Sequence, residues 1–363
     1  MKPVLFVTGN VPAYRVGALE RLHEREGIEL ALFGGTSKHG GAEFAGELPF
    51  PHRTVRPSEL QALAASSGYR AVVCPTGGRL APLATWTGAR RGRVPLILWA
   101  SLWAHPRSAA HALTYLPLRR LYSSADAIVT YGPHVSAYVQ ARGAGNVHVA
   151  PQSVDNGFWS SREVAAPSID GFPTDAAVRF LFVGRDAPEK GLDVLLDAWR
   201  GVRPASRSAA LVLVGGGTVR HEDHQGAPAG PIVALDGLAP QQLRELYAAC
   251  DILVVPSIPT RTFREPWGLV VNEAMDQELA VIASDAVGAA AGGLVRDGEN
   301  GLIVPAGDPQ VLAGAIERLA RDDGLVQQLG RTGARDVAAY THDAWAQGFS
   351  EALVSLGLSR GRW

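Results

Sequence analysis

Short apolar runs alternate with helical stretches along the chain, and this alternation limits the fold more than any other feature. In the first half the apolar runs are 3–9, 28–35, 71–78, 95–101, 127–132 and 147–153. After a break the pattern resumes at 179–185, 209–217, 231–238, 252–257 and 280–285. Near-continuous apolar strands separated by helices predict parallel sheets covered on both faces. The expected fold class is therefore α/β, with two doubly wound, Rossmann-like domains.

The break itself, at 154–177, is rich in Pro, Ser, Gly and Asp and predicts an interdomain linker. We expect a first domain over 1–157 and a second over 158–342. The last segment, 343–363, is helical with an apolar stripe and is predicted to cross back to the first domain. Two such domains would face a cleft, with the ligand site at the carboxyl ends of the strands.

Local signals add detail and exclude some classes of protein. Ser58 to Gln61 reads S-E-L-Q, a pattern that predicts a capping box at the start of a helix. Cys74 and Cys250 are far apart in apolar settings, which argues against a disulfide framework or structural zinc and favours a reducing cytoplasm. The first apolar run is too short for a secretory signal, and no run reaches the roughly 18 residues of a membrane span.

The overall charge gives no indication of a polyanionic partner. The 363 residues are 47% hydrophobic and 19% charged, with a formal net charge of −1. This balance is typical of a soluble globular protein and does not favour nucleic acid as a partner. Lys190 is one of only three lysines against 31 arginines, a bias that suggests a GC-rich bacterial source and draws attention to Lys190.

The stretch FREPWGLVVNEAM, from Phe263 to Met275, carries two acids eight positions apart. Pro266 disfavours helical backbone at Glu265, so this acid is expected in an extended loop. Gly268 is expected to open a helix with Glu273 about one turn inside. Helix N-terminal amides suit a phosphate, and here they belong to Gly268, Leu269 and Val270.

On this stretch alone, a second interpretation is equally good: Glu265 is a solvated loop acid and Glu273 is favoured by the helix dipole. The segment VGRDAPEKG, 183–191, adds two cations at a strand-to-helix turn. Arg185 and Lys190 together suit a diphosphate, because arginine binds it as a fork and lysine as a point charge. The alternative is a solvated loop in which Lys190 pairs with Glu189 or Asp186.

Together these residues resemble the retaining glycosyltransferases of family 4, which have the GT-B fold. Glu265 to Glu273 is similar to that family's signature of two glutamates separated by seven residues, and Arg185 and Lys190 fall at its diphosphate-binding positions. Further segments that resemble the family are 150–159, 214–217, 248–257 and 297–308.

The resemblance implies a role for each of these residues. Arg185 and Lys190 would neutralise the diphosphate of the donor. Glu273 would bind the nucleotide ribose, and Glu265 would contact hydroxyls of the transferred sugar. No metal or cofactor is implied, because the cations and the helix N-terminus supply the charge stabilisation.

The implied activity is metal-independent transfer of a hexose, with retention, from a nucleoside diphosphate sugar to an acceptor hydroxyl. The acceptor class stays open between a small molecule, a glycan and a lipid-linked sugar. Two alternatives also stay open: a nucleotide-sugar epimerase of the same architecture, and a pseudo-glycosyltransferase that binds sugar nucleotide without glycosidic transfer.

In the first domain, His105 lies in the loop after the run 95–101, where family members often carry a histidine that contacts the donor sugar. The alternative is a histidine that caps the following helix. The first loop departs from the family, because Tyr14, Arg15 and Gly17 stand where many members have paired glycines. Tyr14 and Arg15 are expected to face the acceptor, with Arg15 or Gly17 near the diphosphate.

Three tryptophans and two further segments complete the list of candidate features. Trp267 either packs the turn or helps to select the sugar, whereas Trp99 is expected in the core and Trp103 either there or stacked on a sugar. The glycine-rich segment 288–293 either lines the nucleotide pocket or forms a plain turn. The segment LPLRRLY, 116–122, is basic and apolar; it could contact a membrane, but a solvated helix face is favoured.

Overall fold

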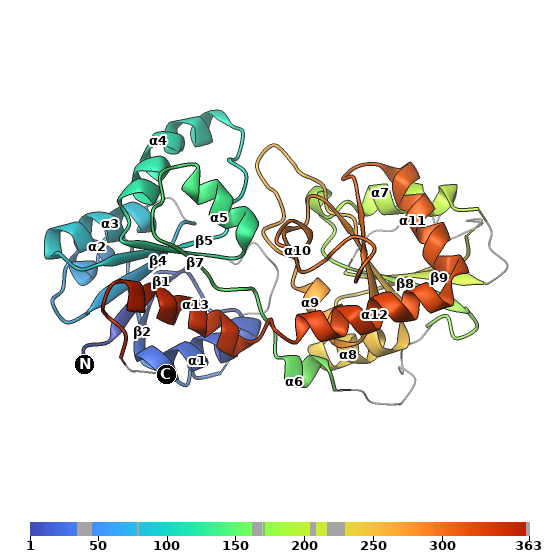
Figure 1. The fold of residues 1–363 in the computed structure, drawn as a ribbon, viewed down its shortest axis with the longest axis horizontal. Helices are drawn as coiled ribbons and strands as arrows, with labels where there is room; N and C mark the ends of the chain where they lie inside the picture. The colour runs from blue at the N-terminus through green and yellow to red at the C-terminus, as the bar shows by residue number, and fades with distance from the viewer. Residues whose placement is uncertain are drawn as a thin grey trace. The chain divides into compact units, whose positions relative to one another are not determined.

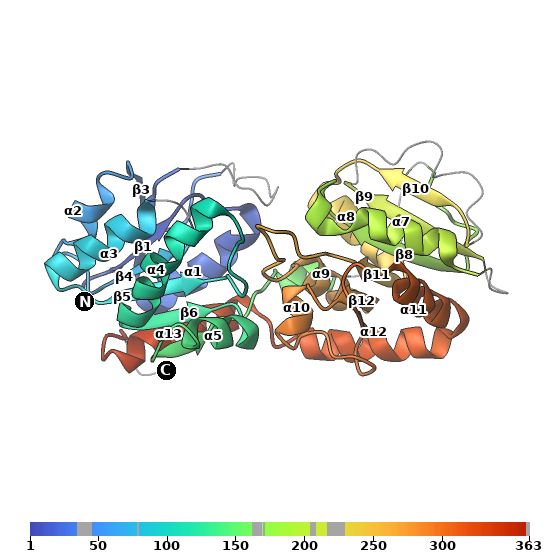
Figure 2. The same cartoon turned by 90° about the horizontal axis from the view of Figure 1, so that it is seen from above.

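The computed structural model describes residues 1–34, 46–77, 80–161, 169, 171–203, 208–215 and 229–360. The chain forms two compact units. The first comprises Met1–Asp155 with Tyr340–Trp363, and the second comprises Asn156–Ala339. In each unit, helices lie on both faces of a parallel sheet (Figures 1 and 2). The predicted α/β class with two Rossmann-like domains is therefore confirmed.

The first unit contains a seven-stranded parallel sheet in the order β3-β2-β1-β4-β5-β6-β7. Its strands are β1 Val4–Thr8, β2 Ile28–Leu32, β3 His52–Thr54, β4 Ala71–Pro75, β5 Leu96–Ala100, β6 Ala127–Thr130 and β7 Val147–Val149. All except β3 coincide with the predicted apolar runs. The sequence did not indicate β3, because its three residues are polar and exposed at the edge of the sheet.

Two groups of helices cover this sheet. One face carries α2 Leu60–Ala64, α3 Ala81–Gly92, α4 Ala109–Ser124 and α5 Pro133–Gln140, and the other carries α1 Val16–Glu26 and α13 His342–Ser355. The capping box predicted at Ser58 is wrong. Helix α2 begins at Leu60 without a side-chain cap, and the Glu59 carboxylate instead accepts a hydrogen bond from the Arg56 amide at 2.7 Å.

Helix α13 joins the first unit although it comes from the end of the chain. Its Phe349 ring lies 5.6 Å from the Phe6 ring, and its Trp345 ring lies 5.7 Å from the Trp99 ring. This confirms the predicted crossing helix and places Trp99 in an aromatic core. Burying such large side chains stabilises the docked helix by several kcal/mol, about 1.5–3 kcal/mol for each one.

The second unit contains a six-stranded parallel sheet in the order β10-β9-β8-β11-β12-β13. Its strands are β8 Val178–Val183, β9 Ala209–Val214, β10 Ile232–Leu235, β11 Ile252–Val255, β12 Ala280–Ser284 and β13 Leu302–Val304. Five of these six strands coincide with the predicted apolar runs. The sixth, β13, is only three residues long and lies inside a segment that we singled out for its family resemblance.

The helices of the second unit begin within the predicted linker. They are α6 Asn156–Trp159, α7 Leu192–Gly201, α8 Pro240–Ala249, α9 Val270–Asp276, α10 Gly288–Ala291, α11 Pro309–Arg321 and α12 Asp323–Val337. Asn156 donates to the Asp276 carboxylate at 3.1 Å, and Gln277 donates to the Trp159 carbonyl. The start of the predicted linker is thus a helix packed on the second unit. No helix in the described ranges is long and apolar enough to cross a membrane.

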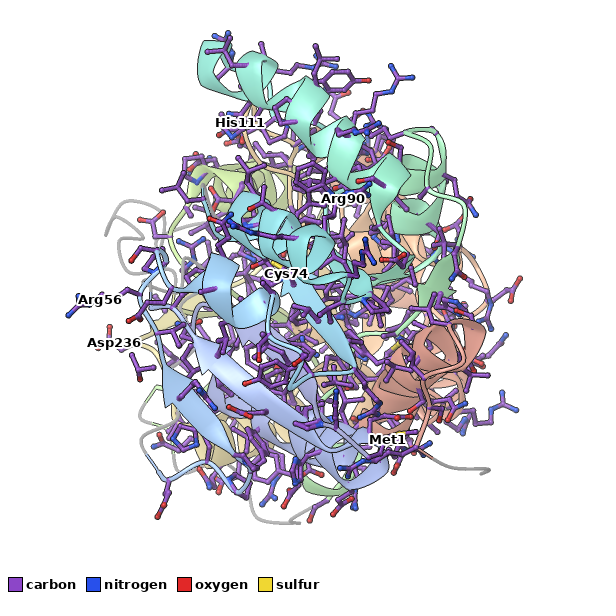
Figure 3. The ribbon with its side chains drawn as sticks, turned by 90° about the vertical axis from the view of Figure 1, so that its left-hand side faces the viewer. Met1, Arg56, Cys74, Arg90, His111 and Asp236 are labelled. Atoms are coloured by element: carbon purple, nitrogen blue, oxygen red, sulfur yellow. The ribbon has the colours of Figure 1, made fainter. Side chains whose placement is uncertain are left out.

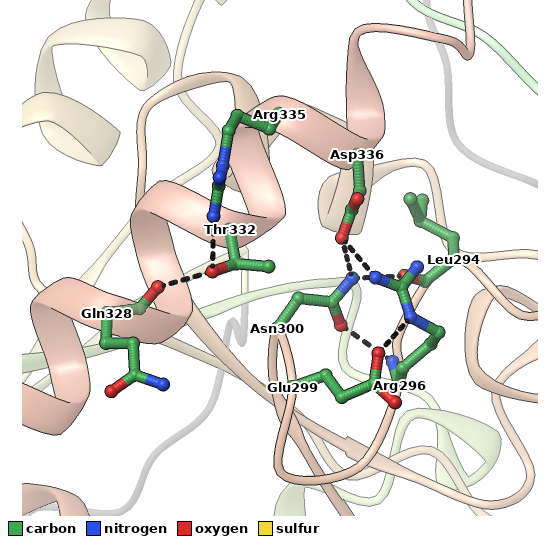
Figure 4. A network of polar contacts seen from close by, with 8 residues as sticks. All are labelled: Leu294, Arg296, Glu299, Asn300, Gln328, Thr332, Arg335 and Asp336. Carbon is green, nitrogen blue, oxygen red and sulfur yellow. Dashed lines mark hydrogen bonds and ion pairs between the residues drawn. The ribbon is translucent and has the colours of Figure 1, made fainter.

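A buried asparagine fixes the loop that precedes β13 (Figure 4). The Asn300 side-chain amide donates to the Leu294 carbonyl at 2.9 Å and to the Asp336 carboxylate of α12 at 2.7 Å. Its oxygen accepts from the Arg296 amide at 2.7 Å, and the Arg296 guanidinium bonds to the same carboxylate. Since a buried amide must be satisfied, this network holds the loop against α12.

Candidate functional site

The turn between β8 and α7 places Lys190 beside the end of β11. A short 3-10 helix, Pro188–Lys190, is followed by Gly191 with a φ of +68°. A Cβ atom at Gly191 would lie 2.1 Å from the Pro256 carbonyl oxygen, so only glycine allows the turn to approach this closely. The Ile258 amide donates to the Glu189 carbonyl at 3.0 Å and fixes the approach.

Lys190 and Glu265 form an ion pair, although 75 residues separate them. The Nζ–Oε2 distance is 2.5 Å, and the side chains are 24% and 8% exposed, respectively. The alternative pairing of Lys190 with Glu189 or Asp186 is therefore wrong. The fold brings together the cation and the acid that the sequence singled out separately.

Arg185 lies in the same turn but in a more exposed position. Its guanidinium bonds to the Glu189 carboxylate at 2.9 Å, and 43% of the Arg185 side chain is exposed. An exposed pair of this kind stabilises the fold little, by about 0–1 kcal/mol, so an anion can replace Glu189 at small cost. The turn thus holds two cations, and both are paired with carboxylates.

The signature segment after β11 leads into α9 as predicted, with a small shift. Gly268 has a φ of +93° and α9 begins at Val270, two residues later. The amides of Gly268, Leu269 and Val270 precede or begin this helix, where intrahelical acceptors are lacking. Trp267 is buried, and its Nε1 donates to the Asn272 side chain at 2.8 Å. This indole packs the turn; a sugar contact by Trp267 stays a prediction.

The segment 288–293 is not a plain turn. Its first four residues form the one-turn helix α10, which is fixed to the signature segment because the Ala289 amide donates to the Trp267 carbonyl at 2.8 Å. A Cβ atom at Gly288 would lie 1.9 Å from the Pro266 carbonyl oxygen. The glycine therefore permits close packing, and a nucleotide contact by this segment stays a prediction.

Glu273 lies in the first turn of α9 and is partly buried. Burial raises the pKa of this carboxyl to about 7, with a further contribution from the nearby Asp276 charge and an opposing one from a Tyr247 hydrogen bond. The Tyr247 hydroxyl, on α8, donates to Glu273 at 2.9 Å. The sequence did not indicate Tyr247, because nothing in its surroundings marks it as a partner of α9.

In the first unit, His105 follows β5 and is held by α4. Its Nε2 lies 2.9 Å from the His111 carbonyl oxygen, and its ring meets the Tyr115 ring edge-on at 5.1 Å. The helix N-cap is Ser108, whose hydroxyl accepts from the His111 amide. His105 therefore does not cap α4 itself, and its predicted contact with the donor sugar stays a prediction.

The first loop buries its arginine. Arg15 is 5% exposed, and its Nη2 donates to the Gln152 side chain at 2.5 Å. The guanidinium carbon lies 5.4 Å from the Trp99 ring centre and 5.3 Å from the Trp345 and Tyr14 ring centres. Arg15 thus packs in an aromatic pocket and is less accessible than we expected; ligand contacts by Arg15 and by the partly buried Tyr14 stay predictions.

Gly17 belongs to the same pocket. A Cβ atom at this position would lie 2.7 Å from the His342 ring, so glycine admits the start of α13. The His342 Nδ1 in turn lies 3.1 Å from the Ser153 hydroxyl. This close packing accounts for the glycine without a ligand, and a diphosphate contact by Gly17 stays a prediction.

The fold defines the class of protein. A solved structure of HepE from Anabaena with UDP-glucose has a TM-score of 0.73 at 18% identity, covering 98% of this chain and 100% of that one. Sucrose-phosphate synthase from Thermosynechococcus elongatus has a TM-score of 0.76 at 21% identity, covering 98% and 99%. The chain has the GT-B fold that these proteins share.

Sequence similarity adds a family match in the second unit. Residues 177–322 match the family Glycosyl transferases group 1. A phosphatidyl-myo-inositol mannosyltransferase of Mycobacterium leprae is 34% identical over 192 residues, 52% of this chain and 49% of that protein. A D-inositol 3-phosphate glycosyltransferase of Acidothermus cellulolyticus is 31% identical over 288 residues, 72% and 62% of the two chains. This chain therefore spans about half to two thirds of the length of these relatives.

Proposed function

We propose that this protein transfers a sugar from a nucleoside diphosphate sugar to an acceptor hydroxyl, with retention at the anomeric carbon. The Lys190–Glu265 ion pair at the strand ends of the second unit carries the proposal. The family match over residues 177–322 includes both members of the pair. A structural neighbour of the same fold was solved with UDP-glucose, which supports a nucleotide-sugar donor.

The proposed mechanism uses charge and position. Lys190 and Arg185 bind the diphosphate and stabilise the negative charge that develops on it as the sugar leaves. Glu265, released from Lys190, accepts hydrogen bonds from sugar hydroxyls, and Glu273 accepts those of the ribose diol. The acceptor hydroxyl attacks the face from which the diphosphate departs, and a diphosphate oxygen takes its proton. No metal is required, because the two cations supply the countercharge.

The ion pair also explains how the unliganded site is kept stable. A nearly buried carboxylate without a partner is costly, so Lys190 compensates Glu265 until the donor arrives. The donor then provides a diphosphate for the ammonium and hydroxyls for the carboxylate. Each charge exchanges one partner for another, so binding leaves neither of them uncompensated.

The experiment has two steps. A thermal-shift panel of nucleoside diphosphates and their sugars identifies the donor, since a ligand at 100 times its Kd stabilises the folded state by about 2.7 kcal/mol. NMR of the product formed with candidate acceptors then gives the anomeric configuration. We expect a stabilising donor and a product with the donor's configuration. An inverted product would contradict retention, and isomerisation of the donor without an acceptor would identify an epimerase.

A further inference from the structure

The part of the first unit that contains α2, α3, β4, β5 and α4 carries only positive formal charge. Between Glu59 and Asp126 the chain has eight arginines and no acidic residue, a charge of +8 within a protein whose net charge is −1. Arg70 is buried and paired with Glu26, and Arg79 lies outside the described residues. The six others are exposed: Arg90, Arg91, Arg93, Arg107, Arg119 and Arg120.

Large apolar side chains are exposed on the same segment. Leu113 and Leu116 of α4 are 81% and 68% exposed, and Leu80 and Leu83 at the start of α3 are 66% and 47% exposed. Within the described ranges, these four are the leucines with the largest exposure. Exposed leucines beside arginines are unusual on a surface that meets only water.

The two kinds of residue share one face of α4. Leu113, Leu116 and Arg120 are spaced i, i+3 and i+7, which places them along one side of a helix. The opposite side, with Leu121 and Tyr122, is buried in the unit. Arg119 flanks the outer side. We name Leu113, Leu116, Arg119 and Arg120 the outer face of α4.

Both ends of α4 are anchored, so its outer face is held in place. At the first end, the Ser108 hydroxyl caps the helix. At the other end, the Trp86 indole of α3 donates to the Ser124 hydroxyl at 2.9 Å. Arg90 lies over the same Trp86 ring and therefore beside α4, as Figure 3 shows together with His111 near the other end of the helix.

The six exposed arginines have no ion pair within the described part of the chain. Their charge is therefore available to a partner. A soluble polyanion would satisfy the arginines but not the leucines. An anionic lipid surface satisfies both, because leucines enter the region below the headgroups while arginines contact phosphate.

We propose that the outer face of α4, with the arginines at the end of α3, binds a bilayer that contains anionic phospholipid. Each arginine near such a surface strengthens binding about fivefold, and two inserted leucines give the contact its preference for a bilayer over a soluble polyanion. This changes our interpretation of 116–122 as a solvated helix face. The proposal does not depend on the donor or on the reaction.

The test is sedimentation of the full chain with vesicles, either pure phosphatidylcholine or phosphatidylcholine with about one quarter phosphatidylglycerol. We expect binding to the anionic vesicles that weakens as salt rises, because salt screens the arginines. Arg119→Gln with Arg120→Gln should weaken it about 25-fold. Leu113→Gln with Leu116→Gln should weaken it at least tenfold, with little effect on the helix, since Gln and Leu have similar helix propensities.

Matched controls lie elsewhere on the molecule. Val354 on α13 is 58% exposed, and Arg318 and Arg331 lie exposed on α11 and α12. Two control variants, the single substitution Val354→Gln and the double substitution Arg318→Gln with Arg331→Gln, should each leave vesicle binding within about twofold of the original protein. Unchanged thermal unfolding of all variants shows that they fold. An absence of binding to anionic vesicles would overturn the proposal. The proposal would also be overturned if only the arginine variant lost vesicle binding and heparin competed equally well for the protein.

Discussion

The two units have the same kind of sheet but use the residues after their strands in different ways. In the second unit, Lys190 pairs with Glu265 and keeps 24% of its side chain exposed. In the first unit, Arg15 is 5% exposed and lies between aromatic rings, one of them Trp345 from α13. A strand-end cation is therefore suited to a ligand only where later segments leave it accessible; in the first unit, α13 encloses it.

The largest effect is expected at Lys190. Lys190→Met removes the charge that binds and stabilises the diphosphate, so we expect transfer to fall on the order of 10²–10³-fold or more. Glu265→Ala should abolish transfer similarly. The measurement is product formation under saturating donor. Near-full turnover in either variant would contradict the site.

The ion pair offers a control for folding. Lys190→Met removes the ion pair with Glu265 and should lower the free energy of unfolding, because an almost buried carboxylate loses a charged partner. The double variant Lys190→Met with Glu265→Gln should recover that stability without recovering transfer. Denaturant unfolding of both variants separates the two effects. Recovery of transfer in the double variant would show that neither charge is needed.

Arg15 should behave in the opposite way. Arg15→Ala removes a buried hydrogen bond and ring contacts and leaves a cavity, so we expect a loss of about 2–4 kcal/mol in the free energy of unfolding. Arg15→Met keeps most of the volume and should cost less. Urea unfolding measures both. Full stability of Arg15→Ala together with lost transfer would instead support the ligand contact that the sequence predicts for Arg15.

The fold was largely predictable because buried parallel strands are nearly continuous apolar runs. The edge strand β3 was missed since His52 and its neighbours are polar, and α6 was missed because Asn156 lies in a Pro- and Ser-rich segment. The local structure of the candidate site was predictable where one motif holds the residues, as in the loop at Glu265 that leads into α9. Partners distant in sequence, such as Tyr247 for Glu273, were not predictable, since topology alone brings them together.

A smaller effect is expected from the protonation of Glu273. Because its pKa is raised to about 7, the folded state holds this proton more tightly than the unfolded chain does. The residue's contribution to the free energy of unfolding therefore declines as pH rises from about 4.5 to 7. Relative to Glu273→Gln, the original protein should lose thermal stability over that range. Parallel pH profiles for the two proteins would contradict this.

Donor binding should have the opposite pH dependence. A ribose diol needs the carboxylate as acceptor, so affinity should weaken as pH falls below 7, by at most tenfold per pH unit. Glu273→Gln should bind weakly at every pH. Calorimetric titration between pH 5.5 and 8 measures both. A donor affinity that does not change with pH in the original protein would contradict the proposal that Glu273 binds the ribose.

The smallest effect is expected from chelation. If Lys190 and Arg185 supply the countercharge, EDTA should leave transfer unchanged within about twofold. A large loss of activity with EDTA that Mg²⁺ or Mn²⁺ restores would contradict metal-independent transfer.

The central claim is that the Lys190 turn of the second unit binds a diphosphate. Its most direct test is calorimetric titration of the identified nucleoside diphosphate and the matching monophosphate into the original protein and Lys190→Met. We predict that the diphosphate binds the original protein at least tenfold more tightly than the monophosphate, and that Lys190→Met abolishes this difference. Equal affinities in the original protein, or an unchanged difference in the variant, would contradict the claim.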